Sequence, residues 1–228
     1  MLAHFLHRMT DIVPVSPNAA VETAAPTPAA KRSSKPDVYP VLEKLAALYP
    51  RLFGAEFLPL KRGIFQDLQD LNPDQFEREQ LKAALAFHTR STRYLTAVAS
   101  GQQRHDLQGV AVEAMAPEHV HHAVLEVFRR RQLRSRENLR PKLVARIAQA
   151  IEASGMAPSA YAELVRSKDE SANAALDEAR LEAETRAAKQ EALMRAFQAS
   201  GKTAAEFADM YGLDAAAVRR LSAAPQVF

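Results

Sequence analysis

The sequence predicts a mainly α-helical protein with one small β-hairpin, followed by an all-helical C-terminal extension. Apolar residues recur at helical spacing in most segments between residues 37 and 224. Residues 103–112 have instead the short extended pattern and the glycine turn that are typical of a hairpin. From residue 142 onward the pattern is helical throughout, including a stretch rich in alanine and charged residues.

Composition limits the class of protein. The chain has 228 residues, which suits one or two domains, and 47% of them are hydrophobic, enough for a sizeable core. The absence of cysteine excludes disulfides, thiolate chemistry and cysteine-type zinc sites, and it fits a reducing compartment. No apolar run reaches the roughly 20 residues of a membrane span, and the apolar start is too short for a secretory signal. We therefore expect a soluble cytoplasmic protein without membrane contact.

The chain divides into three parts. Residues 1–36 are rich in proline and alanine without apolar periodicity, which predicts a disordered arm. Residues 37–140 form the predicted main domain. Residues 141–228 form the predicted helical extension, with a weak internal repeat in which Ala153-Ser154-Gly155 recurs as Ala199-Ser200-Gly201. In each copy we expect a helix, a glycine stop and a second helix with a buried aromatic residue.

The main domain begins with a helix that we expect Asp37 to cap and Tyr49-Pro50 to end, because proline cannot continue a helix. Pro59 suits the start of the next helix, where its missing N–H costs nothing. Asn72-Pro73-Asp74 breaks the chain, and Asp74 is the expected cap of the long helical pattern that runs from Phe76 to Leu95.

Within that long pattern a basic stripe lies beside the apolar face. At 100° per residue, Arg78, Lys82, Thr89 and Arg93 fall on one stripe. Lysine and arginine at such spacing are suited to tracking phosphates, although a solvated helix face has the same pattern. A second basic stretch, residues 129–146, carries eight basic residues and one acidic residue.

Six motifs in sequence order resemble the ProQ/FinO family of bacterial RNA-binding proteins and RNA chaperones over about residues 38–125. They are Tyr49-Pro50 with Phe53, the Pro59–Leu68 block (PLKRGIFQDL), Leu81-Lys82-x-Ala84-Leu85, Arg93-Tyr94-Leu95, Arg104-x-Asp106-Leu107-x-Gly109, and Glu118-His119-Val120-x-His122-Ala123.

The resemblance implies binding to the base of an RNA stem and to the single-stranded 3′ tail beyond it, as on terminators of small RNAs and mRNA 3′ ends. It implies post-transcriptional regulation and 3′-end protection. The basic positions of the family's concave face would then match Lys61, Arg78 and Lys82, and Tyr94, Arg104 and Arg93 would lie near the RNA 3′ end. The full set of predicted RNA-binding residues is Lys61, Arg62, Gly63, Arg78, Lys82, Thr89, Arg90, Arg93, Tyr94 and Arg104.

Several of these residues have a structural alternative. Tyr94 is either an RNA-stacking residue or a core tyrosine with a satisfied hydroxyl. Arg104 is either a phosphate contact or the partner of Asp106 or another carboxylate. Gly63 also fits a role in close helix packing.

The sequence departs from the pattern of the family it resembles at a few positions. Ala86 and Val124 stand where relatives often carry arginine, and His88 and Thr92 replace aromatic residues, with Arg90 as an extra cation.

Other functions have weaker signals. No P-loop, nucleophile elbow, HExxH motif or dinucleotide loop occurs, so we expect no enzyme and no cofactor. His119 and His122 share a helix face, but their spacing favours structural histidines over a metal site. Residues 203–221 have a spacing similar to a helix-turn-helix, so a DNA-binding regulator is one alternative. A protein-interaction adaptor using residues 142–228 is the other.

Overall fold

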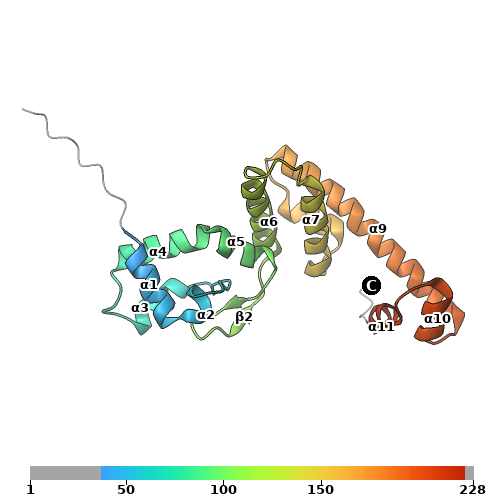
Figure 1. The fold of residues 1–228 in the computed structure, drawn as a ribbon, viewed down its shortest axis with the longest axis horizontal. Coiled ribbons are helices and arrows are strands. Elements are labelled where there is room, and N and C mark those ends of the chain that lie inside the picture. The colour runs from blue at the N-terminus through green and yellow to red at the C-terminus, as the bar shows by residue number, and fades with distance from the viewer. Residues whose placement is uncertain (1–36, 224–228) are drawn as a thin grey trace, which may run out of the picture. The chain divides into compact units, whose positions relative to one another are not determined.

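The computed structural model of the chain describes residues 37–223. The predicted disordered arm, residues 1–36, lies outside the described residues. Within the described range there are eleven helices and one two-stranded antiparallel sheet (Figure 1), which confirms the predicted mainly α fold with a small hairpin. The elements are α1 (Tyr39–Leu48), α2 (Pro50–Phe53), α3 (Ile64–Leu71), α4 (Arg78–Arg90), α5 (Thr92–Ala99), β1 (Arg104–His105), β2 (Ala111–Glu113), α6 (Pro117–Gln132), α7 (Arg140–Ser154), α8 (Pro158–Val165), α9 (Glu170–Ser200), α10 (Ala204–Tyr211) and α11 (Ala215–Ala223).

One continuous apolar core extends from α1 to the first half of α9. It includes Leu45, Leu68 and Leu81 in the first part of the chain and Ile147 and Leu176 in the extension. The domain boundary that the sequence predicts at residue 140 falls between α6 and α7, which contact each other in this core. A second, smaller cluster joins the end of α9 to α10 and α11 around the buried Phe207.

The helix starts predicted at Pro59 and Asp74 are wrong. Pro59 begins no helix: Leu60 is extended and bridges to His105, and α3 begins only at Ile64. Asp74 does not cap the next helix. The carboxylate of Glu77 does so instead, accepting hydrogen bonds from the N–H groups of Glu79 and Gln80. Both errors have one cause. Proline and aspartate favour helix starts but are also common in turns and loops, so the local sequence does not show which of them begins a helix.

The long helix predicted from Phe76 to Leu95 is two helices. The chain turns extended at Ser91, whose hydroxyl accepts a hydrogen bond from the N–H of Tyr94 and so caps α5. The first helix also starts differently from the prediction, since Val38 is the N-cap of α1 and Asp37 only accepts a hydrogen bond from the N–H of Tyr39. The predicted end of α1 before Tyr49-Pro50 is confirmed.

The extension has the helix–glycine–helix form predicted for both copies of the repeat. Gly155 ends α7 and Gly201 ends α9, and the aromatic residues Tyr161 and Phe207 of the following helices are fully buried. One side of the alanine-rich helix α9 is buried, because a stripe that includes Ala175, Leu176, Ala179 and Ala183 packs into the core. Its exposed side carries i,i+4 ion pairs such as Arg180–Glu184 at 2.6 Å.

Two buried histidines make the stability of this core sensitive to pH. Burial lowers the pKa of His88 to about 4, and His121 shifts to a pKa of about 4 for the same reason. The ring of His88 lies among aromatic rings, with its centroid 4.7 Å from that of Phe53 and 4.3 Å from that of Phe57.

We expect the free energy of unfolding to fall as the pH drops from about 6.5 towards 4. Both histidines are neutral in the folded chain, whereas the unfolded chain takes up their protons below a pKa of about 6.5. The loss is about 1.4 kcal/mol per pH unit for each histidine in that window. Urea unfolding at pH 7, 6 and 5 measures it, with His122→Gln as an exposed control that should show the same slope. A stability that is constant from pH 7 to 5 would contradict this prediction.

Candidate nucleic-acid interface

The Leu60–Gly63 turn, defined as residues 60–63, is held in place by two distant parts of the chain. The N–H of Leu60 donates to the hydroxyl of Tyr94 at 3.1 Å, and its carbonyl accepts from Nη1 of Arg104 at 3.0 Å. The N–H of Lys61 donates to the carbonyl of His105 at 2.8 Å. Helix α5 and the hairpin therefore hold the turn from both sides and limit its motion.

Gly63 ends this turn and begins helix α3. Its φ of +79° lies in the left-handed region, and a Cβ added there would meet nothing within 4 Å. Glycine is therefore present for its backbone conformation, and the prediction of close helix packing at Gly63 is wrong. Within the described residues, the N–H groups of Gly63 and Phe65 have no hydrogen-bond partner. Two free donors at the start of a helix form a favourable position for an anion.

Cationic side chains surround these free donors. Lys61 pairs with Asp67 at 2.7 Å, and the pKa of Lys61 is raised chiefly by that hydrogen bond. The side chain of Arg62 is 66% exposed, and its Nε lies 3.8 Å from Glu113. Arg104 is nearly covered, and its Nε lies 3.6 Å from the same carboxylate. The turn thus carries two cationic side chains, Lys61 and Arg62. Each has an acidic partner within the chain that an incoming anion could replace.

Arg78 and Lys82 extend this basic surface along α4. The Arg78 guanidinium lies 5.7 Å from the ring centroid of Phe65, which is in the first turn of α3, so Arg78 lies beside the turn. Lys82 is 70% exposed, and its Nζ is 3.9 Å from Glu79, a pair too exposed to restrain the lysine strongly. Both cations remain available to an incoming anion.

Tyr94 lies in the core and not on the surface. Only 7% of the residue is exposed, its hydroxyl accepts the hydrogen bond from Leu60, and burial raises the pKa of its phenol. In this conformation the ring has no free face for a base, so the structure favours the alternative reading of Tyr94 as a core tyrosine with a satisfied hydroxyl. Tyr94 and Arg104 act on the turn by binding the two polar backbone groups of Leu60.

The other predicted site residues lie apart from the turn. The hydroxyl of Thr89 donates to the carbonyl of Leu85 within its own helix. Arg93 donates to the carbonyl of Ala55, and its guanidinium lies 4.3 Å from the ring centroid of Phe57. Arg90 is exposed, and its carbonyl accepts from Arg130. No contact between the described residues joins these three side chains to the Leu60–Gly63 turn.

Sequence reasoning missed Glu113 and His119. The carboxylate of Glu113 accepts from the N–H of Arg62 at 3.1 Å and lies between Arg62 and Arg104. His119 Nδ1 is 3.4 Å from Nη2 of Arg104. The hairpin register pairs Arg104 with Glu113 across the two strands, with an irregularity between Arg104 and His105. The predicted hairpin ended at residue 112, one residue before Glu113, and the irregularity could not be read from the local pattern. Among the described residues no cluster of three or more potential ligands is arranged to hold a metal ion.

The basic stretch 129–146 is largely occupied by partners within the chain. Arg129 and Arg130 both bind Glu126, and Arg140 pairs with Glu178 at 2.7 Å. In the described part of the chain, the cations of this stretch that have no such partner are Arg131, Arg134 and Arg136.

Residues 37–140 thus form a helical domain with a short hairpin, in which two free backbone donors and a cationic turn are suited to an anionic ligand. Residues 36–140 match the model of the ProQ/FINO family. The chain therefore contains a ProQ/FinO family domain at residues 36–140, and the resemblance found over about residues 38–125 is confirmed.

Relatives with names in this family are similar to the same part of the chain. An RNA chaperone ProQ from Idiomarina loihiensis is 40% identical over 87 residues, which are 36% of this chain and 42% of that protein. The RNA chaperone ProQ of Vibrio vulnificus is 42% identical over 87 residues, with the same two shares. The chain thus spans less than half the length of these relatives.

A crystal structure of a FinO-like RNA chaperone from Neisseria meningitidis MC58 is also similar. It is 31% identical, and the match covers 38% of this chain and 88% of the other, with a TM-score of 0.35. In residues 37–223 no helix combines the length and apolar character that crossing a membrane requires.

Proposed function

We propose that this protein is an RNA chaperone that binds structured RNA hairpins with a single-stranded 3′ tail. Its partners would be small RNAs and mRNA 3′ ends, and its effects would be 3′-end protection and post-transcriptional regulation in the cytoplasm. It would act by binding, without turnover chemistry and without a cofactor. The family membership and the names of the relatives support RNA as the ligand.

The observation that carries the proposal is the Leu60–Gly63 turn. The free N–H groups of Gly63, in the turn, and of Phe65, in the first turn of α3, suit the oxygens of one phosphate. Lys61 and Arg62 precede them in the chain. A phosphate there would replace Asp67 as the partner of Lys61 and Glu113 as the partner of Arg62, so binding would require no large rearrangement. A tail phosphate of the RNA suits this position, because a flexible single strand can orient one phosphate towards the two N–H groups.

Arg78 and Lys82 supply the second part of the proposed interface. A-form RNA is recognised mainly through its phosphates and 2′-hydroxyl groups, because its major groove is too narrow for side chains. Two exposed cations one helical turn apart on α4 suit successive phosphates of a stem. Tyr94 and Arg104 then serve as positioning residues that hold the turn against α5 and the hairpin.

Terminator-type hairpins test the proposal directly. The full-length chain should bind a hairpin with a 3′ uridine tail much more tightly than the same hairpin without a tail or with a blocked 3′ hydroxyl, at fixed salt. Equal affinity for all three would reject tail recognition and leave only a generic basic surface. Deleting residues 203–221 should leave this preference intact, whereas a DNA-binding regulator would lose its nucleic-acid binding.

Replacing Glu113 with glutamine should strengthen RNA binding about two- to fivefold, on the scale of one exposed ion pair. The substitution frees Arg62 and Arg104 from a competing carboxylate, while the amide oxygen still accepts from the N–H of Arg62. Fluorescence anisotropy with the tailed hairpin measures the change. Glu163→Gln removes an equal charge from an exposed position on α8 and should have a smaller effect. Weaker binding by Glu113→Gln would contradict a phosphate at this turn.

A further inference from the structure

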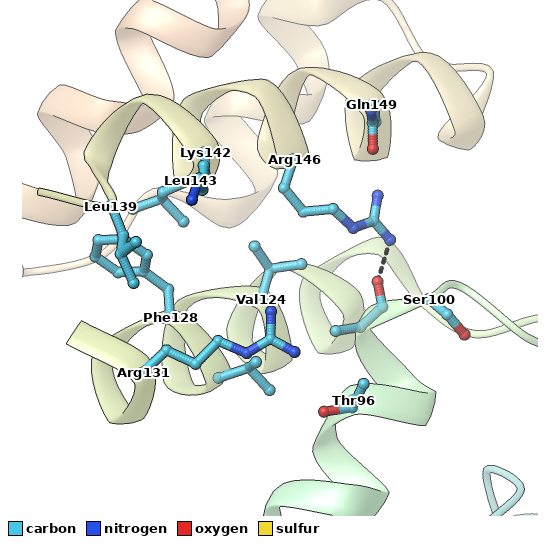
Figure 2. Close-up of a pocket in the computed structure, with 12 residues that line it drawn as sticks. Thr96, Ser100, Val124, Phe128, Arg131, Leu139, Lys142, Leu143, Arg146 and Gln149 are labelled. Carbon is cyan, nitrogen blue, oxygen red and sulfur yellow. Dashed lines mark hydrogen bonds between the residues drawn. The ribbon is translucent and has the colours of Figure 1, made fainter. Parts of the chain in front are cut away.

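A groove of about 630 Å³ lies between α5, α6 and α7, away from the turn described above (Figure 2). Helix α7 begins at the last residue of the family match, so nearly all of one wall belongs to the extension of this chain. The volume is within the usual range of ligand sites, roughly 300–1,000 Å³. This groove is therefore large enough for a bound group and is partly built outside the family domain.

All the charged side chains that line the groove are cationic. Arg131 of α6 and Lys142 and Arg146 of α7 line it, and its described lining contains no acidic residue. Figure 2 shows Arg131 and Arg146 extending from opposite walls towards the same space. Lys142 has only an exposed contact with Glu137 at 3.6 Å. The three cations repel one another, and no carboxylate of the lining offsets this repulsion, so an anion in the groove would relieve it.

One of these cations already has a structural role. Arg146 donates to the carbonyl of Ala99 at the end of α5, where a cation offsets the negative end of the helix. Helix capping accounts for Arg146 alone. The side chain of Arg131 has no hydrogen-bond or ion-pair partner among residues 37–223, although it contributes to the lining. The unexplained charges are therefore Arg131 and Lys142.

The floor of the groove is apolar. Val124, Val127, Phe128 and Leu143 form it, and the residues Thr96 and Ser100 lie at its rim. A duplex backbone is too highly charged and too broad to fill an apolar floor. A single unpaired nucleotide combines a flat base for the floor with a phosphate for an arginine fork, and its sugar hydroxyls match polar groups at the rim.

We propose that the α5–α6–α7 groove takes an unpaired nucleotide of a bound RNA, with the base on the apolar floor and the phosphate on Arg131 and Lys142. This inference rests on the proposed RNA-binding function and adds a second contact site to it. With this second site, the chain would contact a longer stretch of RNA than the turn and α4 contact alone.

Thiol labelling tests occupancy of the groove, since the chain contains no cysteine. Ser100→Cys places one thiol at the rim, and Ala187→Cys places one on the exposed side of α9 as the control. The RNA probe is a hairpin with single-stranded extensions at both ends, at a free concentration of about ten times its Kd. The thiol introduced by Ser100→Cys should then react with a maleimide about tenfold more slowly, and the control thiol at an unchanged rate.

The outcomes separate this inference from the proposed function. If the full-length chain does not bind the tailed hairpin, the proposed function fails. If the RNA binds but both thiols react at unchanged rates, the groove inference alone is overturned, and an acidic protein segment becomes the better occupant. Protection by the extended hairpin and not by a blunt hairpin of the same stem supports an unpaired nucleotide.

A pair of arginine variants provides a second measurement. Arg131→Gln should weaken binding of the extended hairpin and lower the slope of log K against log salt by roughly one unit. Arg134→Gln removes an equal charge from the same basic stretch outside the groove and should change both quantities less. Equal effects of the two variants would show a diffuse electrostatic contribution and reject a defined site.

Discussion

Replacing Tyr94 with alanine should lower the free energy of unfolding by about 3–5 kcal/mol, because it leaves a cavity where a buried aromatic ring packs against His88. Tyr94→Phe should cost about 1–3 kcal/mol, because it leaves the N–H of Leu60 buried without its acceptor. Urea unfolding of the two variants beside the natural chain measures both losses. Tyr39→Phe, at an exposed tyrosine, is the control and should be close to neutral.

RNA affinity of Tyr94→Phe then distinguishes positioning from stacking. A phenylalanine ring stacks on a base as well as a tyrosine ring, so a stacking residue would tolerate this change. A positioning residue would not, because the turn that carries Lys61 and Arg62 loses its hydrogen bond to α5. We expect weaker binding of the tailed hairpin at a temperature where the variant remains folded. Unchanged affinity would reject the positioning role of the hydroxyl.

The double substitution of Lys61 and Arg62 by glutamine should have the largest effect on RNA binding. Each cation is expected to contribute about 1–3 kcal/mol as a charged hydrogen-bond donor to phosphate. The loss should appear as a weaker Kd and as a salt slope that is lower by about two units, one for each phosphate contact. Stability should change little, because both side chains lie at the surface and their ion pairs are exposed.

A matched control removes the same net charge from the extension. Lys189 and Lys202 are exposed in the C-terminal half of the chain, so the double glutamine variant there changes overall charge without touching the turn. If both double variants lose the same affinity, the interaction depends on net charge, and the Leu60–Gly63 turn is not the site. A loss confined to the first variant, with the preference for a 3′ tail abolished, supports tail recognition at the turn.

Local sequence was a good guide where the physical cause is local. Helical spacing of apolar residues identified the main helices, because one face of each must enter the core. Gly109, with a φ of +74°, allowed the hairpin to be located, since few other residues adopt that conformation. Helix boundaries were less predictable. The break at Ser91 lies within a continuous helical pattern of apolar residues. Its local sequence signal is a serine whose hydroxyl can cap α5.

The candidate site shows the same division. Sequence motifs identified Lys61, Arg62 and Gly63 as one unit because they are adjacent in the chain. The linear stripe of Arg78, Lys82, Thr89 and Arg93 was only partly preserved, because the turn at Ser91 directs Arg93 to the Ala55–Phe57 loop. Glu113 escaped notice because its importance depends on hairpin register and on a turn 51 residues earlier in the chain.

The sequence by itself determined the family, the helical class and the cationic turn, since each of these is encoded in adjacent residues or in a regular period. Only the tertiary structure decided the role of Tyr94. Its hydroxyl meets Leu60, 34 residues away, and this contact makes it a buried support for the turn. The groove between α5, α6 and α7 likewise exists only because α7 packs on α6 and Arg146 reaches the end of α5. Contacts between distant segments depend on how whole elements pack together, and the local pattern of residues does not specify that packing.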